Sequence, residues 1–164
     1  MIQELRKILD DNKDKRVCVC GVGCSGKSTL VKQLPGAIDL DNIVRANLPK
    51  EAATRLSLRK NGKTFAGKEQ DKAIRTWTGE MHQEWQKYVW KTVKEFQIKP
   101  GRPVFSVIPF AHSDLIVYLD IDTKLLFERA KKRGENPEQV IGWVKWLEGM
   151  IADAGLPVIR LRLY

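Results

Sequence analysis

The chain is poor in the residues that most often bind transition metals, with three cysteines and two histidines. Cys18, Cys20 and Cys24 form no CxxC pair, and both histidines lie far from them in the sequence. The ligand spacing typical of a zinc site is therefore absent. Cys18 and Cys20 are two residues apart on a predicted strand, which places them on one face of it. We interpret both as small core side chains.

Long apolar runs are also absent. No run approaches the ~20 residues of a membrane span, and the amphipathic segment 1–9 lacks the apolar stretch of a signal peptide. These absences predict a cytoplasmic protein without a membrane partner. Hydrophobic residues make up 43% and charged residues 30% of the 164 residues, which is ordinary for a globular chain. We expect a single domain over residues 1–164.

Acidic residues are fewer than basic ones, 20 against 29, which gives a net charge of +9. Such an excess suits a polyanionic partner or an anionic substrate, although a merely basic surface would also explain it. Segment 55–72 has little apolar periodicity and contains the turn signal Asn61-Gly62. We predict that it is a mobile substrate loop. Its basic residues are Arg55, Arg59, Lys60, Lys63, Lys68 and Lys72.

The most specific motif is the run Gly21-Val22-Gly23-Cys24-Ser25-Gly26-Lys27-Ser28, called the phosphate loop below. It matches the P-loop pattern, in which four residues separate two glycines and Lys-Ser follows. Glycines let backbone N–H groups turn inward around phosphate oxygens, and a following helix adds the positive end of its dipole. Lys27 can reach the β- and γ-phosphates, and the Ser28 hydroxyl can bind Mg²⁺.

We therefore expect the chain to bind a nucleoside triphosphate. The expected nucleotide-binding positions are Gly21, Gly23, Cys24, Ser25, Gly26, Lys27, Ser28 and Thr29. Cys24 also lies at a helix N-terminus, which predicts a lowered thiol pKa and sensitivity to oxidation without a catalytic role.

Apolar strands alternate with helical patterns along the chain. We expect strands at 17–20, 37–40, 104–108, 115–120 and 157–161, and helices at 2–10, 27–34, 42–48, 69–97, 123–133 and 137–154. This alternation predicts a three-layer α/β/α fold in which helices cover both faces of a parallel sheet. On the long helix 69–97, we expect two of Trp77, Trp85 and Trp90 to pack in the core and Trp90 to be the most exposed.

Two acids follow the second predicted strand, at the edge where parallel sheets bind ligands. Two-residue alternation puts Asp39 and Asp41 on the same side. One carboxylate could hold the water shell of Mg²⁺ while the other accepts a proton, or both could be solvated turn residues. The third strand ends at Pro109 without an acid, which favours Asp39 near the metal over Asp120 or Asp122.

Arg129 and Arg133 lie one turn apart on a predicted helix. The guanidinium fork suits phosphate oxygens, although basic residues are also common at helix ends. The phosphate loop, the acidic element 38–41 and this arginine pair together resemble the small P-loop kinases of the adenylate-kinase-like group. The acidic element is similar to that of shikimate kinases, gluconate kinases and phage-type polynucleotide 5′-kinases.

The resemblance implies a P-loop NTPase fold with five parallel strands in the order 2-3-1-4-5, and ATP and Mg²⁺ as cofactors. It assigns Lys27 and Ser28 to phosphate and Mg²⁺, Asp39 to the metal and Asp41 to the role of acceptor base. Arg129 and Arg133 would belong to a lid, about residues 123–137, that closes over ATP, with Arg133 among the catalytic residues.

We expect a kinase that transfers the γ-phosphate of ATP to a hydroxyl of a nucleotide or of a nucleic acid, that is DNA, RNA or a modified base within it, and the basic charge favours DNA. The chain lacks an Asp-Arg-Tyr/Ser signature and a glycine-rich run after the third strand. The first departure argues against a plain nucleoside-monophosphate kinase, and the second argues against a shikimate kinase. Two alternatives stay open: a small-metabolite kinase of the same fold, and a P-loop NTPase without an acceptor. The sequence leaves the oligomeric state open.

Overall fold

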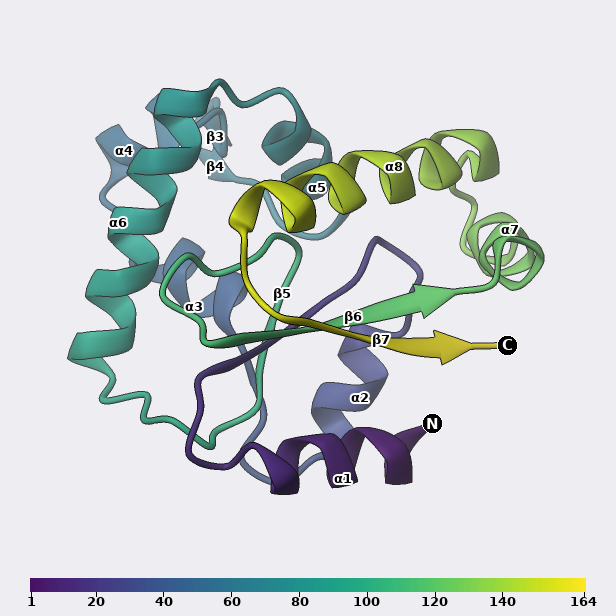
Figure 1. Ribbon diagram of the computed structural model, residues 1–164. Helices are drawn as coiled ribbons and strands as arrows, with labels where there is room; N and C mark the ends of the chain where they lie inside the picture. Colours follow the sequence, from purple (N-terminus) through teal and green to yellow (C-terminus); the bar gives the residue numbers. More distant parts are fainter. The chain divides into compact units, whose positions relative to one another are not determined.

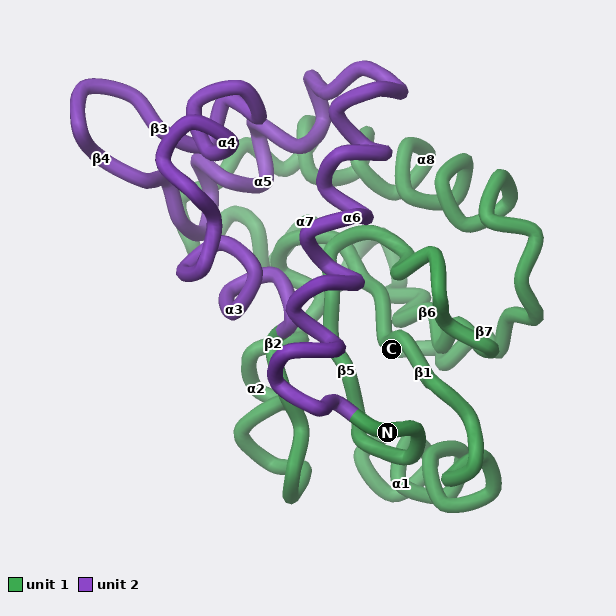
Figure 2. Tube along the Cα trace, turned by 90° about the vertical axis from the view of Figure 1, so that its left-hand side faces the viewer, with its two compact units in different colours: residues 1–39, 99–164 green, residues 40–98 purple.

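The computed structural model describes all residues 1–164, and the chain divides into two compact units (Figure 2). Unit 1 consists of residues 1–39 and 99–164, and unit 2 of residues 40–98. Unit 1 contains one parallel sheet with four helices, whereas unit 2 contains four helices and a two-stranded hairpin. None of the helices is both long enough and apolar enough to cross a membrane.

The sheet of unit 1 is built around β1 (Val17–Cys20), which pairs in parallel with β5 (Val104–Ser106) and β6 (Leu115–Ile121). The edges are β2 (Ile38–Asp39) beside β5 and β7 (Val158–Leu163) beside β6. The order is thus β2-β5-β1-β6-β7. Counted among the sheet strands alone, it is 2-3-1-4-5, which confirms the predicted fold class.

Burial explains why the central strands form there. All four side chains of β1 are buried, and β6 is buried along almost its whole length, as parallel strands covered on both faces require. The helices α1 (Ile2–Asp11) and α2 (Lys27–Gln33) lie on one side of the sheet, and α8 (Pro137–Ala154) lies on the other (Figure 1). This three-layer arrangement is the fold of P-loop NTPases.

Side-chain caps set the boundaries of the helices between β6 and β7. Asp122 caps α7 (Thr123–Lys132) by accepting hydrogen bonds from the backbone N–H groups of Lys124 and Leu125. Asn136 caps α8 in the same way, Pro137 follows at its first position, and Gly155 ends it in the left-handed conformation. Both ends of α8 are as the sequence predicts.

Two buried tryptophans, Trp77 and Trp85, lie in the core of unit 2. Trp85 is fully buried, and its ring lies 5.4 Å from that of the buried Trp77, whereas Trp90 is partly exposed. The expectation for the three tryptophans is confirmed. The helices and strands of this unit are α3 (Leu40–Asn47), α4 (Lys50–Arg55), β3 (Arg59–Lys60), β4 (Lys63–Thr64), α5 (Lys68–Arg75) and α6 (Gly79–Glu95).

The single helix predicted over 69–97 is wrong, because the chain breaks between α5 and α6. Thr78 caps the start of α6 by accepting a hydrogen bond from the Met81 N–H. The Trp77 indole N–H donates to the carbonyl oxygen of Leu56. This contact is made 21 residues away along the chain, so helical periodicity alone could not reveal the break.

The segment 55–72 contains regular secondary structure where the sequence predicts a loop. Leu56 and Leu58 are fully buried, and β3 and β4 form an antiparallel hairpin. Asn61 and Gly62 both have positive φ, 53° and 75°, as the tight turn of a two-residue hairpin requires. Residues 59–64, called the basic hairpin below, expose Lys60 and Lys63 at their tip.

Candidate active site at the phosphate loop

The backbone of the phosphate loop takes conformations that favour glycine. Gly26 has φ 99° and Cys24 has φ 66°, both in the left-handed region. A Cβ atom on Gly21 would lie 2.5 Å from the Ser25 Oγ, which is closer than van der Waals contact allows. Gly21 and Gly26 therefore allow the turn that the motif predicts.

The Ser25 hydroxyl is the unsatisfied group of this loop. Its side chain is 1% exposed, and its Oγ has no hydrogen-bond partner. A buried hydroxyl without a partner costs about 1–3 kcal/mol. Such a cost is tolerated where a ligand supplies the missing hydrogen bond, because functional sites store strain of this kind.

Lys27 lies across the loop rather than in solvent. Its Nζ donates hydrogen bonds to the carbonyl oxygens of Gly21 and Val22, the latter at 3.1 Å. The ammonium group therefore lies beside the loop that the motif assigns to phosphate. Ser28 and Thr29 follow in the exposed first turn of α2.

Arg129 of α7 and Arg133, which follows the last residue of α7, reach the same loop from more than one hundred residues away in the sequence. The Arg129 Nη1 donates to the carbonyl oxygen of Ser25 at 3.2 Å, and the Arg133 Nη1 lies 3.7 Å from the Cys24 Sγ. The Arg133 Nε is also 3.8 Å from the carboxylate of Glu135. The structure thus brings Arg129 and Arg133 to the phosphate loop within unit 1.

The prediction of a lowered pKa for Cys24 is wrong. Burial raises the pKa of this thiol, and the nearby Glu135 carboxylate raises it further, while Arg133 opposes them. The residue is buried in the turn of the loop, so loss of water outweighs any benefit from the following helix. Cys18 and Cys20 are also buried, with their sulfur atoms 3.4 Å apart, which confirms that they share one face.

Asp39 is the last residue of β2, and the phosphate loop follows β1, so both lie at the carboxyl ends of the parallel strands. Asp39 is in register with Phe105 of β5, which is in register with Val19 of β1. Neighbouring strands are ~4.8 Å apart, so the Asp39 backbone lies roughly 10 Å from β1. Ser106, which is buried beside Cys20, takes the strand-end position where an acid is common in P-loop enzymes.

Asp41 belongs to unit 2 and lies in the first turn of α3. The alternation argument that placed it on the same side as Asp39 is wrong, because a helix begins at Leu40 and ends the strand geometry. The side chain is 4% exposed. One helical turn later, the Nε of Arg45 is buried and has no hydrogen-bond partner. Sequence reasoning did not single out Arg45, whose Nη2 donates a hydrogen bond to the Oδ1 of Asn42 at 3.1 Å.

The two fallback acids are engaged elsewhere. Asp122 caps α7, and the Asp120 carboxylate lies 3.4 Å from the Arg160 guanidinium and 4.0 Å from that of Arg162. Burial raises the pKa of Tyr118 to about 12, and the nearby carboxylates of Glu148 and Asp120 contribute to this rise. These contacts give structural roles to Asp120, on β6 beside β7, and to Asp122, at the start of α7.

The chain has no group of three or more His, Cys, Asp or Glu side chains that could hold a metal ion. This does not conflict with Mg²⁺ chemistry, because Mg²⁺ is commonly bound through one or two protein oxygens and substrate phosphates. The Ser28 hydroxyl and the Asp39 carboxylate are oxygen ligands of the kind that Mg²⁺ prefers.

Comparison with known proteins shows the fold. No protein-family model and no curated protein sequence matches the chain. Among solved structures, the crystal structure of TT1252 from Thermus thermophilus matches with a TM-score of 0.55 and 17% identity, over 90% of this chain and 87% of that one. The structure of deoxyadenosine kinase from M. mycoides with bound dATP matches with a TM-score of 0.35 and 12% identity, over 89% and 90% of the two chains. A TM-score of 0.35 supports no conclusion.

Proposed function

We propose that the protein is a Mg²⁺-dependent kinase that transfers the γ-phosphoryl group of ATP to a hydroxyl of a nucleotide or nucleic acid. The phosphate loop carries this proposal, because its buried Ser25 hydroxyl lacks a partner and three cationic side chains surround it. Lys27, Arg129 and Arg133 supply positive charge from α2 and α7. This is the arrangement that phosphoryl transfer needs, since its catalysis is mostly positioning and charge stabilisation.

In the proposed reaction, the acceptor hydroxyl oxygen attacks the γ-phosphorus, the bond from phosphorus to the bridging oxygen breaks, and ADP leaves. Lys27 and Arg133 stabilise the charge on the transferring group, while Arg129 holds α7 against the loop. Asp41 accepts the proton of the acceptor hydroxyl. Mg²⁺, held by Ser28 and Asp39, would neutralise phosphate charge when bound.

The assignment of Asp41 as the base is supported by its position in the chain and its chemistry. Two residues span at most about 7 Å, so the Asp41 backbone stays near that of Asp39 whatever the arrangement of the units. The carboxylate is also buried on α3, where water competes less for the acceptor hydroxyl. The Arg45 guanidinium, one turn away on the same helix, suits an anionic group of the acceptor.

The acceptor class is supported by charge. The net charge of +9 and the exposed cations of the basic hairpin fit a polyanion better than a small neutral metabolite.

The test is to incubate the protein and its Lys27→Ala variant with ATP labelled in the γ-phosphate and a panel of oligonucleotides, nucleotides and metabolites. Transfer of label to an oligonucleotide or nucleotide supports the proposal. Label on a metabolite indicates a small-metabolite kinase, and phosphate release without an acceptor indicates an NTPase. Equal activity of the Lys27→Ala variant would overturn all three.

A further inference from the structure

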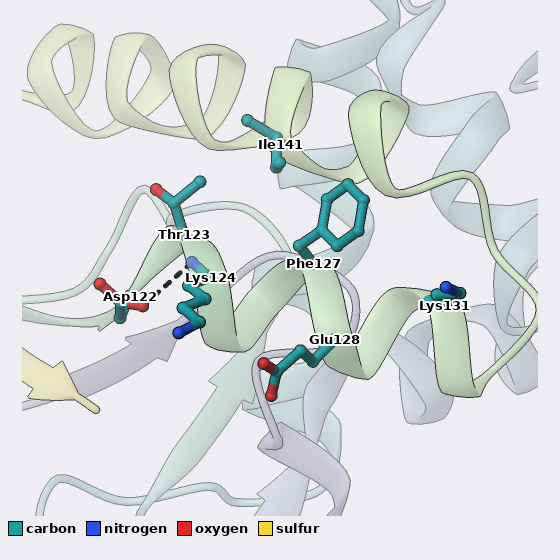
Figure 3. Close-up of a pocket in the computed structure, with 7 residues that line it drawn as sticks. All are labelled: Asp122, Thr123, Lys124, Phe127, Glu128, Lys131 and Ile141. Carbon is teal, nitrogen blue, oxygen red and sulfur yellow. Dashed lines mark hydrogen bonds between the residues drawn. The ribbon is translucent and has the colours of Figure 1, made fainter.

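An open cavity lies between α7 and α8, on a part of unit 1 that the proposed reaction does not use (Figure 3). Its volume is about 660 Å³, within the ~300–1,000 Å³ of small-molecule sites. The lining side chains are Asp122, Thr123, Lys124, Phe127, Glu128, Lys131 and Ile141. We call it the α7–α8 cavity.

An exposed aromatic ring forms the apolar part of this cavity. Phe127 is 43% exposed, and its ring points toward Ile141 of α8 (Figure 3). Leu126 and Ala130 hold α7 in the core. Because Phe127 lies about 200° around the helix axis from Arg129, at 100° per residue, it faces away from the side that meets the phosphate loop. The cavity and the nucleotide loop therefore use different faces of α7.

Two lysines flank the ring on the same stripe of the helix. Lys124 and Lys131 lie three residues before and four residues after Phe127, the spacing of neighbours on one helix face. Neither ammonium group has an ion-pair or hydrogen-bond partner in the structure. They are seven positions apart in the sequence, so their backbones are roughly 10 Å apart along the helix axis.

Two acids also line the cavity, so the formal charges of its lining balance. One oxygen of Asp122 accepts hydrogen bonds from the start of α7. The Glu128 carboxylate and the Lys124 side chain both point away from α8, whereas the Phe127 ring points toward it (Figure 3). The side of the cavity that faces α8 thus presents the aromatic ring, and the long flexible stems of Lys124 and Lys131 allow their ammonium groups to reach phosphates of a ligand beside it.

We propose that the α7–α8 cavity binds a segment of single-stranded nucleic acid, with one base stacked on Phe127 and neighbouring phosphates on Lys124 and Lys131. An aromatic platform between cations is the general means by which proteins bind single strands without reading their sequence. The lysine spacing and the length of their side chains suit phosphates on either side of a stacked base. This binding does not require phosphoryl transfer, and it gives a strand a point of attachment outside the active site.

The experiment measures the binding of a fluorescein-labelled twelve-nucleotide oligo(dT) to the full chain by anisotropy, without ATP. Phe127→Ala should weaken binding about tenfold or more, and Phe127→Leu should also weaken it, because both remove the stacking ring. The matched control is Phe96→Ala, which removes a ring that is 48% exposed outside the cavity and should leave affinity unchanged. Circular dichroism checks that each variant is folded.

The lysines are tested by salt titration. Lys124→Ala/Lys131→Ala should reduce the slope of log K against log salt by about 1.4, or roughly 0.7 per phosphate on a single strand. The control pair Lys13→Ala/Lys32→Ala removes the same charge from exposed positions elsewhere and should change the slope little. Equal effects of the two pairs would contradict the proposal.

Photocrosslinking locates the strand directly. Ultraviolet irradiation with the same oligo(dT), followed by trypsin, should place the adduct on the peptide 125–129, which contains Phe127. Adducts confined to other peptides, or unchanged affinity in Phe127→Ala, would overturn the proposal. Failure of the labelled-ATP assay would leave this result unaffected, because strand binding and phosphoryl transfer are measured separately.

Discussion

The Arg129 guanidinium donates a hydrogen bond to the Ser25 carbonyl oxygen at 3.2 Å, across 104 residues of sequence. This bond fastens α7 to the phosphate loop, and the same Ser25 has the buried hydroxyl without a partner. A residue outside the motif therefore helps to determine the shape of the motif.

We expect Arg129→Ala to weaken ATP binding by about tenfold to a hundredfold, because hydrogen bonds to charged groups are worth about 1.5–3 kcal/mol. The measurement is isothermal titration with ATP and Mg²⁺. Arg162→Ala serves as the control, since this side chain is well exposed at the opposite edge strand. Equal affinity in the Arg129 variant and the native protein would show that the contact is unimportant for nucleotide binding.

Lys27→Ala should reduce phosphoryl transfer by on the order of 10²–10³ while the protein stays folded, because the lysine acts where the transferring group is most negative. Turnover is measured with labelled ATP, and folding by circular dichroism. Lys32→Ala removes an exposed lysine from the same helix and should be nearly silent. Near-normal turnover in folded Lys27→Ala would exclude a kinase that works through this loop.

Asp41→Asn should lower kcat far more than it weakens ATP binding, because a base for the acceptor hydroxyl acts in the chemical step. Asp39→Asn should instead raise the Mg²⁺ concentration needed for half-maximal rate. Comparing kcat, ATP affinity and the Mg²⁺ dependence of the two variants separates the roles. If Asp41→Asn keeps full turnover, the base lies elsewhere.

The basic hairpin provides a test of the acceptor. Replacing Arg59, Lys60 and Lys63 together with alanine should weaken oligonucleotide binding and flatten its salt dependence, since each cation that neutralises a phosphate contributes to the slope. ATP affinity should stay nearly unchanged. The control replaces Lys13, Lys15 and Lys32. If the native protein binds no oligonucleotide even at low salt, the acceptor is a nucleotide or a small metabolite.

Cys24 should react slowly with iodoacetamide at neutral pH, because burial raises its thiol pKa and only the thiolate is nucleophilic. The pH at which the rate reaches half of its maximum should be higher than for an ordinary cysteine. Glu135→Gln removes a negative charge that raises the pKa, so it should shift this rise to lower pH. The alkylation rate at Cys24 is followed by mass spectrometry, and an unshifted profile in Glu135→Gln would contradict the assigned cause.

The phosphate loop and the parallel sheet could be predicted from the sequence because their signals are local. Gly21 and Gly26 are spaced for a phosphate-binding turn, and a buried strand and a helix flank them. Neighbouring residues likewise predict the continuous burial of β6 and the start of α8 at Asn136-Pro137. Short-range spacing and apolar runs are therefore enough to predict the layers, whereas the strand order was implied by the family resemblance that the motifs carry.

The tertiary structure decided the features that depend on distant partners. The expected long helix breaks at Trp77, whose indole N–H donates to the Leu56 carbonyl oxygen. The pKa of Cys24 rises because burial and Glu135 outweigh the opposing effect of Arg133. The exposed ring of Phe127 occupies a cavity only because α8 packs beside α7. Periodicity reports which side chains share a face, but the groups that meet that face come from elsewhere in the chain, and their contacts determine burial, charge and chemistry.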